Sequence, residues 1–177
     1  MTASDVESSL GYAVWSDDIV AVRRLLAEGH DVDDDAWGKG IKTPLMESLD
    51  EVEAFYDEDR RAVTALLLEY GADVHRRDES GRTPMHYAAG VGAAGVEMLL
   101  ARGANVNAQA HDGSTPLHVA VGRGSVSAVD ALLHAGANAE LCDGRGQTAE
   151  GLLPQDSRSD TEEDASIRVL LTRQPRE

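Results

Sequence analysis

The chain has 177 residues, so we expect one domain over 1–177 that is large enough to bury a real core. Its 32 acidic and 16 basic side chains give a formal net charge of −16, which argues against nucleic acid and anionic membranes, because those ligands are bound by basic side chains. Cys142 is the only cysteine, which excludes an intrachain disulfide. The polar start does not look like a secretory signal and no apolar run could span a membrane, so we expect a cytoplasmic protein.

The first 42 residues predict two short helices and an acidic loop. "SSLGYAV" starts the first helix, which carries Tyr12 and Trp15, and "LLAEGHDVDD" ends the second helix at a glycine. The connecting loop "DVDDDAWGKGIK" (31–42) places four aspartates within five residues and Trp37 at what should be an exposed turn. This part of the chain is therefore marked by acidic and aromatic side chains.

The next helix begins at Thr43 with "TPLMESL", and this unit is longer than the later ones. It takes 28 residues from Thr43 to its closing glycine, whereas the unit that starts at Thr115 takes 21. The extra residues fall near "DEVEAFYDEDRR" (50–61), which holds Phe55 and Tyr56. An apolar anchor surrounded by charge is typical of a protein-binding hot spot. The alternative is that Phe55 packs under its own loop and covers the helix ends.

The same pattern then recurs as "GRTPMHYAAG" (81–90) and "GSTPLHVAVG" (113–122). Thr83 and Thr115 are 32 residues apart, and Thr148 follows 33 residues later, so the chain has an internal repeat. Each threonine can cap a helix, and the proline after it stands at the first helical position, where its missing N–H costs nothing.

The unit that starts at Thr115 shows the logic of the repeat. After a turn at Gly124 we expect a second helix that Gly136 ends in the left-handed conformation. One face of that helix carries the apolar residues Val126, Val129, Leu132 and Leu133. Since neither helix can bury its apolar side alone, consecutive units must stack into one continuous core.

The C-terminal segment "SRSDTEEDASIRVLLTRQPRE" is typical of a helix that closes the stack. Its N-terminus is predicted at a capping box formed by Ser159 with Glu162 or by Asp160 with Glu163. The apolar face that would cover the last unit consists of Ile167, Leu170 and Leu171.

The T-P-L-H-x-A signature, followed after the second helix by Gly-Ala-x-x-Asn, resembles the ankyrin repeat. The resemblance covers about residues 8–173, with signatures at Thr43, Thr83 and Thr115. It implies an all-α solenoid of stacked helix-turn-helix units with protruding hairpin-like loops. The repeats fall at about 8–42, 43–82, 83–114, 115–147 and 148–173, the first and last being degenerate. The resemblance also implies that His86 and His118 brace the turn between neighbouring units.

The resemblance further implies a partner-binding face. Tyr12 and Trp15 align with positions that face the concave groove in ankyrin-like proteins, and the alternative for Trp15 is that it covers the exposed end of the stack. His111 replaces a turn residue in the third loop and is expected to be solvated. The residues that we expect to contact a partner are Tyr12, Trp15, Asp33, Asp34, Asp35, Trp37, Glu47, Asp50, Glu51, Phe55, Tyr56, Tyr87, His111 and Arg123.

The sequence holds no complete motif for a metal, a cofactor or catalysis. Asp31, Asp33 and Asp35 match the first positions of a calcium loop, but Ala36 and Lys42 stand where the loop needs glycine and glutamate. The six histidines are scattered, and the lone cysteine has no evident base partner. We therefore expect no bound metal, no cofactor and no enzymatic activity.

These features favour a non-catalytic protein that binds another protein through its concave face and loops. Residues 1–59 hold 16 acidic and 4 basic side chains, so the expected partner has a basic surface. One concrete form is an acidic inhibitor, or immunity protein, that covers a toxin or nuclease. The alternatives are a general adaptor or assembly scaffold whose acidity serves solubility, and a metal-responsive switch at Asp31–Asp35. The free protein is expected to be a monomer.

Overall fold

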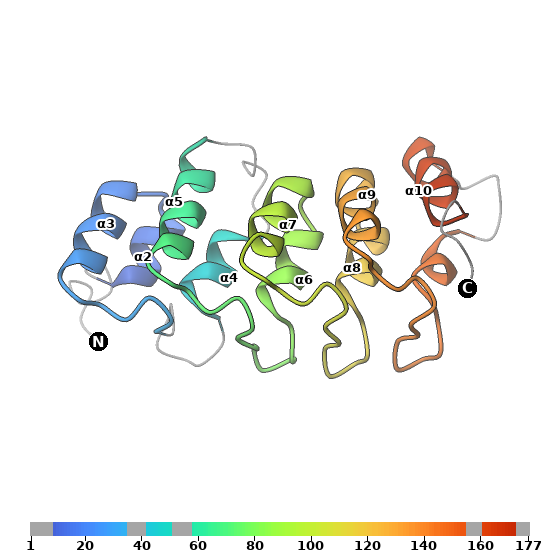
Figure 1. Cartoon of the computed structure of the whole chain (residues 1–177), viewed down its shortest axis with the longest axis horizontal. Coiled ribbons are helices and arrows are strands. Elements are labelled where there is room, and N and C mark those ends of the chain that lie inside the picture. The colour runs from blue at the N-terminus through green and yellow to red at the C-terminus, as the bar shows by residue number, and fades with distance from the viewer. Residues whose placement is uncertain (1–8, 35–41, 51–57, 155–160, 173–177) are drawn as a thin grey trace.

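The computed structural model describes residues 9–34, 42–50, 58–154 and 161–172, and within them the helices come in pairs (Figure 1). The pairs are α2 (Leu10–Trp15) with α3 (Ile19–Ala27), α4 (Pro44–Ser48) with α5 (Glu58–Glu69), α6 (Pro84–Ala89) with α7 (Ala93–Leu100), and α8 (Pro116–Gly122) with α9 (Val126–His134). A 3₁₀ turn, η1 (Glu150–Leu152), is followed by α10 (Glu162–Thr172). Within these ranges no residue lies in a β-strand, and one β-bridge joins Cys142 to Thr148.

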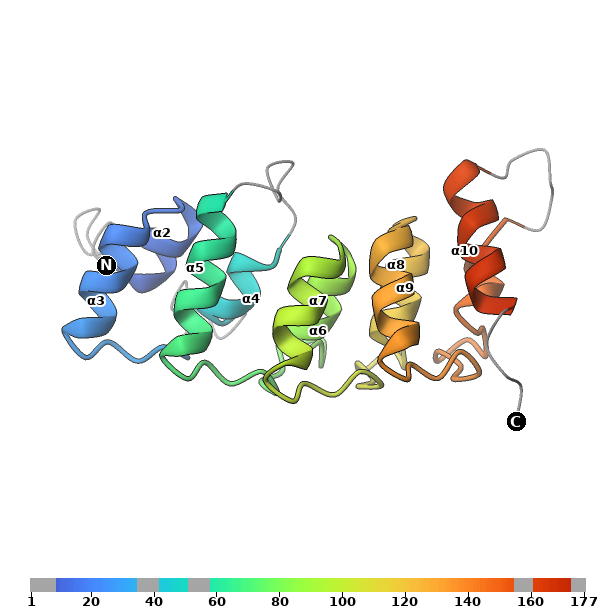
Figure 2. The same cartoon turned by 45° about the horizontal axis from the view of Figure 1, so that its top comes forward.

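The pairs stack side by side into an elongated solenoid (Figures 1 and 2). The first members form an inner row in which α2 contacts α4, α4 contacts α6, α6 contacts α8, and α8 contacts η1. The second members form an outer row in which α3 contacts α5, α7 contacts α9, and α9 contacts α10. The loops that lead into α6, α8 and η1 project on the same side of the stack (Figure 1). This architecture confirms the predicted all-α solenoid.

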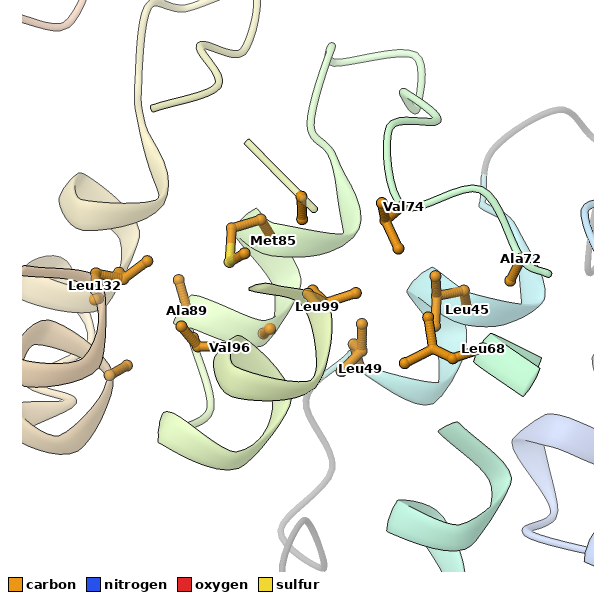
Figure 3. Close-up of a cluster of buried hydrophobic side chains, with 14 of the residues drawn as sticks. Leu45, Leu49, Leu68, Ala72, Val74, Met85, Ala89, Val96, Leu99 and Leu132 are labelled. Carbon is orange, nitrogen blue, oxygen red and sulfur yellow. The ribbon is translucent and has the colours of Figure 1, made fainter. Parts of the chain in front are cut away.

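A continuous apolar core runs through the stack. Leu45 of α4 and Leu49, which directly follows this helix, lie in one cluster with Met85 of α6 and Leu99 of α7, and each of these side chains is at most 1% exposed (Figure 3). Close packing depends on small residues: a Cβ atom placed on Gly95 of α7 would lie only 3.0 Å from Leu49 Cδ2. Neighbouring units therefore bury each other's apolar faces, as the repeat predicts.

The helix starts and stops follow the local sequence signals. The Thr43 and Thr115 hydroxyls accept hydrogen bonds from the Met46 and His118 N–H groups at 3.3 and 3.4 Å, and a proline follows each threonine. Gly136 follows α9 with a φ of 86°, which glycine adopts without the cost that a side chain would add. These features confirm the predicted caps of the inner helices and the predicted end of α9.

The cap of the last helix differs from the prediction. Thr161 N donates to Asp164 Oδ2 at 2.9 Å, and Asp164 N donates to Thr161 Oγ1 at 3.1 Å. The predicted capping pairs Ser159–Glu162 and Asp160–Glu163 are therefore wrong, because the helix begins two positions later than the first pair requires and one later than the second, and the acidic partner is the shorter aspartate. Ser159 and Asp160 themselves lie outside the described residues.

The apolar face of α10 is only partly covered. Ile167 and Leu171 are buried, whereas Leu170 is intermediate and Val169 is 49% exposed. None of the helices in the described part of the chain combines the length and apolar character that a membrane crossing needs.

Candidate partner-binding face

Two buried histidines link consecutive units. His86 Nδ1 accepts a hydrogen bond from Thr83 N–H at 3.0 Å, so its proton is on Nε2, which donates to the Ser114 carbonyl of the next loop at 3.2 Å. Burial lowers the pKa of His86, which keeps the ring neutral. His118 makes the same bonds to Thr115 N–H and to the Gln147 carbonyl, at 3.2 and 3.0 Å. The bracing role implied by the ankyrin resemblance is confirmed.

The projecting loops are bonded into a row. Asp78 Oδ1 accepts from the N–H groups of Ser80 and Arg82 at 2.8 and 2.7 Å, which closes the first described loop on itself. The His111 N–H then donates to the Ser80 carbonyl at 2.8 Å, and the Gly144 N–H makes the equivalent bond one loop further along, at 2.7 Å. His111 is exposed, as expected, and its backbone also joins two loops.

The Asp33 side chain connects the loop of the first unit to that of the second. Both of its carboxylate oxygens accept from the Asp73 N–H, at 3.0 and 3.1 Å, just as Asn107 Oδ1 accepts from Asn138 N–H at 2.8 Å. Burial raises the pKa of Asp33, although the hydrogen bond from Asp73 opposes this shift. Asp33 was predicted to contact a partner, and sequence reasoning missed its structural role. Its alignment with Asn107 on the Leu-Leu-x-x-Gly landmark was the available signal.

Several predicted contact residues cannot be placed. Asp35, Trp37, Glu51, Phe55 and Tyr56 lie outside the described residues, so the acidic insertion and part of the first loop stay predictions. Asp34 is described and exposed.

The aromatic side chains at the start of the inner row are open to solvent. Trp15, the last residue of α2, is 50% exposed, and the centroid of its ring lies 5.7 Å from that of Tyr12. Tyr12 is half-buried one turn earlier on the same helix. Together they offer an aromatic surface to a ligand, and an indole can stack on a guanidinium or attract an ammonium group.

A buried arginine joins the ends of α2 and α4. Arg60 is 5% exposed, and its guanidinium donates to the carbonyls of Trp15 and Glu47 at 3.3 and 3.2 Å and to Asp17 Oδ2 at 3.0 Å. Its Nε also lies 2.7 Å from Asp17 Oδ1, which accepts no hydrogen bond and is held by charge. Trp15 and Glu47 are therefore brought next to each other. The sequence gives no signal for this, since Arg60 sits in a charged run that is typical of a solvated face.

Acidic groups gather around Tyr87 on α6. The Tyr87 hydroxyl donates to Asp78 Oδ2 at 2.7 Å, and burial together with this acceptor raises the pKa of Tyr87. Lys42 Nζ lies 5.3 Å from the centroid of the Tyr87 ring and forms an ion pair with Asp50. The negative charge of Glu47 also acts on the Tyr87 hydroxyl. The predicted residues Glu47, Asp50 and Tyr87 are thus brought together.

Comparison with known proteins agrees with this architecture. The family model described as ankyrin repeats (3 copies) matches residues 10–110 and, in an overlapping match, 51–143, which together span more than half of the chain. This chain belongs to the ankyrin repeat family. Ankyrin repeats generally mediate protein–protein interaction and are typically non-catalytic.

One curated relative of this ankyrin repeat protein is the 2-5A-dependent ribonuclease of Mus musculus, which is 38% identical over 85 residues. The match covers 47% of this chain and 10% of the ribonuclease. The matched part of this chain therefore corresponds to only about a tenth of that relative.

The far end of the inner row carries basic side chains. Arg123 is exposed at the C-terminal end of α8, where a Cβ atom on Gly90 would lie 3.9 Å from Arg123 Cγ. Arg123 thus lies beside the C-terminal end of α6, and its expected contact with a partner stays a prediction. The inner face changes in charge along its length.

The described ranges hold no group of three or more His, Cys, Asp or Glu side chains arranged to bind a metal ion. Asp31 Oδ1 accepts from the Asp33 N–H at 3.0 Å, and both Asp33 oxygens accept from Asp73. The carboxylates of these two residues in the acidic loop therefore bond to backbone N–H groups of the repeats.

Proposed function

We propose that this ankyrin repeat chain acts as one recognition unit that binds a basic segment of a partner protein at the N-terminal part of its inner face. The acidic aromatic face comprises Tyr12, Trp15, Glu47, Asp50 and Tyr87. The observation that carries the proposal is the Arg60 guanidinium, which donates to the backbone carbonyls of Trp15 and Glu47 and so joins the end of α2, where Trp15 is exposed, to the acidic end of α4.

The chemistry of this face suits arginine and lysine side chains. A cation stacked on an exposed indole contributes roughly 0.5–1 kcal/mol, and neighbouring carboxylates add charge complementarity that favours fast and specific encounter. Residues 1–59 carry four times as many acidic as basic side chains, so the long-range field around this face is negative. A partner with a basic surface would be steered toward it.

The specific form that we propose is an acidic inhibitor. A chain that covers the cationic surface of a nuclease or another toxin blocks that surface without catalysis, as an immunity protein does. In this proposal the free chain is a cytoplasmic monomer that needs no cofactor.

Affinity capture from the native host lysate tests the function. The bait proteins are the wild-type chain, a W15A/E47Q variant and, as a control, E97Q, which removes one exposed carboxylate from the outer helix α7. We expect wild type and E97Q to capture one basic protein that leaves the bait as salt rises, and W15A/E47Q to lose it. Equal capture by all three baits, or an assembly that resists salt, would overturn the proposal in favour of a general adaptor.

A further inference from the structure

A hollow of about 500 Å³ lies on the C-terminal side of the acidic aromatic face, and the charge of Arg82, one of its lining residues, also acts on the Tyr87 hydroxyl of that face. Val119 of α8 and Leu152 of η1 form its apolar part, and Leu152 is 39% exposed although it is a large apolar residue. Arg82 and Arg145 contribute from the loops that precede α6 and η1. The hollow therefore combines an open apolar surface with two guanidinium groups.

The acidic side chains that line the hollow are engaged in the loops. Asp112 Oδ1 accepts from the N–H and the hydroxyl of Ser114 at 3.0 and 2.6 Å. Asp143 Oδ1 accepts from two N–H groups of its own loop at 2.8 and 2.9 Å. In contrast, within the described ranges no side-chain hydrogen bond or ion pair involves the guanidinium of Arg82 or Arg145, and both residues are exposed. The donors available to a ligand are therefore the two guanidinium groups, whose charges also act on the Asp112 and Asp143 carboxylates.

We propose that this hollow is a second docking point, which takes a partner segment that carries a leucine-sized apolar side chain followed by carboxylates. The apolar side chain packs between Val119 and Leu152, which removes apolar surface from water. The carboxylates lie against Arg82 and Arg145, whose planar guanidinium groups match a carboxylate with two parallel hydrogen bonds.

This inference rests on the proposed function and makes it more specific. A single partner that reaches both docking points must be basic where it meets Trp15 and acidic where it meets Arg145. Such a segment binds in one direction only, because the reversed direction would bring like charges together.

The test is a titration of the full ¹⁵N-labelled chain with three blocked peptides, followed by two-dimensional NMR at low salt. The peptides are acetyl-Leu-Glu-Glu-amide, acetyl-Leu-Gln-Gln-amide and acetyl-Leu-Lys-Lys-amide. We expect the Glu peptide to shift the amide signals of Val119, Gly144 and Leu152 saturably and to bind about tenfold more tightly than the Gln peptide, since two exposed ion pairs contribute modestly. The Lys peptide should not shift these signals.

Variants locate the charge. R82Q and R145Q should each weaken the Glu peptide about three- to fivefold, whereas R23Q, at an exposed arginine of α3, should leave its affinity unchanged. Because all three arginines are exposed, the variants should melt at the wild-type temperature. The proposal is overturned if the Glu peptide shifts none of these signals, if the Lys peptide binds as well, or if R82Q and R145Q bind like wild type.

The two proposals fail separately. Binding of the Glu peptide together with no capture of a basic protein would overturn the proposed function and retain the hollow as a carboxylate-binding site. If a basic protein is captured through Trp15 and Glu47 but no peptide binds, only the proposed docking point at the hollow is overturned.

Discussion

At the scale of single residues, buried charge is tolerated here because it is fully paired. Arg60 is nearly inaccessible, yet its guanidinium meets two carbonyls and the Asp17 carboxylate. Asp17 itself has a φ of 56°, a conformation that costs a non-glycine residue energy, so the surrounding bonds must hold it there. This one cluster fixes the ends of the first two inner helices.

Removal of Arg60 should therefore be costly. We expect R60A to lower the free energy of unfolding by about 3 kcal/mol, because the Asp17 carboxylate stays partly buried without its counter-charge. Urea unfolding measures the difference. R61A is the matched control, since Arg61 is the next residue and is exposed. A loss of less than about 1 kcal/mol, the range of an exposed ion pair, would contradict the role given to Arg60.

His86 should make stability depend on pH. Its folded pKa lies below the unfolded value of 6.5, so the unfolded chain takes up the proton more readily. The contribution of the neutral ring is fully present above pH 6.5 and is lost as the pH falls from there toward the folded pKa. Urea unfolding measures the free energy of unfolding at pH 7.5 and 5.5. The difference between the two pH values should be smaller for H86A than for wild type, whereas H134A, at an exposed histidine, should match wild type.

At the scale of helices, local signals decide where each one begins. Three inner helices, α4, α6 and α8, start at Thr-Pro, and the outer helices of four units stop at Leu-Leu-x-x-Gly, so a short stretch of sequence specifies where each of these helices begins or ends. The cap of α10 lacks such a clear signal, because "SRSDTEED" offers Ser159, Asp160 and Thr161 in a row as possible N-caps. Only the reciprocal bonds of Thr161 and Asp164 decide among them.

The corrected cap predicts the effect of a mutation at α10. T161A should destabilise this helix by about 1 kcal/mol, the usual value of a lost N-cap hydroxyl. T172A, at the exposed end of the same helix, should change little. Because α10 contacts only α9 strongly, the loss should appear as faster hydrogen exchange of the α10 amides. Equal exchange in both variants would show that Thr161 does not cap α10.

At the scale of the whole molecule, charge is separated along the inner face. Glu47 and Asp50 lie toward the N-terminal units, whereas Arg82, Arg123 and Arg145 lie toward the C-terminal ones. The N-terminal end carries the larger charge, which is negative, and this charge attracts a basic partner before contact. We therefore expect the charge to change mainly the association rate.

We expect the association rate of the captured basic partner to fall as salt rises. Neutralising the acidic face with E47Q/D50N should slow association and flatten its salt dependence, while the dissociation rate changes less. Surface plasmon resonance at three ionic strengths measures both rates. E97Q/D130N removes the same charge from the outer helices and should behave like wild type. An identical salt slope in all three proteins would refute electrostatic steering by the acidic face.

The sequence predicts the repeats but not the contacts that distant residues make. Periodic threonines, prolines and glycines were sufficient to predict the solenoid, because each unit repeats the same helix-starting and helix-ending residues. The binding face was predicted only as a set of positions: Glu47, Asp50 and Tyr87 do come together, whereas Asp33 lies in a joint between units. The role of Arg60 was missed because its partner Asp17 lies 43 residues away in the chain, and a single contact of this kind does not recur in the repeat pattern.

The histidine braces make part of this chain extensible. His86 donates to the carbonyl of Ser114, directly before the threonine that opens the next unit, and His118 donates to that of Gln147 in the same position, so the third and fourth units present equivalent joints to their successors. If the fourth unit were duplicated and the copy placed directly after the original, the histidine donor and the carbonyl acceptor of the joint would already be in position. The inner face would then be longer by one helix. The second unit offers no such freedom, because Arg60 needs the carbonyl of Trp15 and the carboxylate of Asp17 in the unit before it. A longer version of this protein would therefore be built by duplication near its C-terminal end.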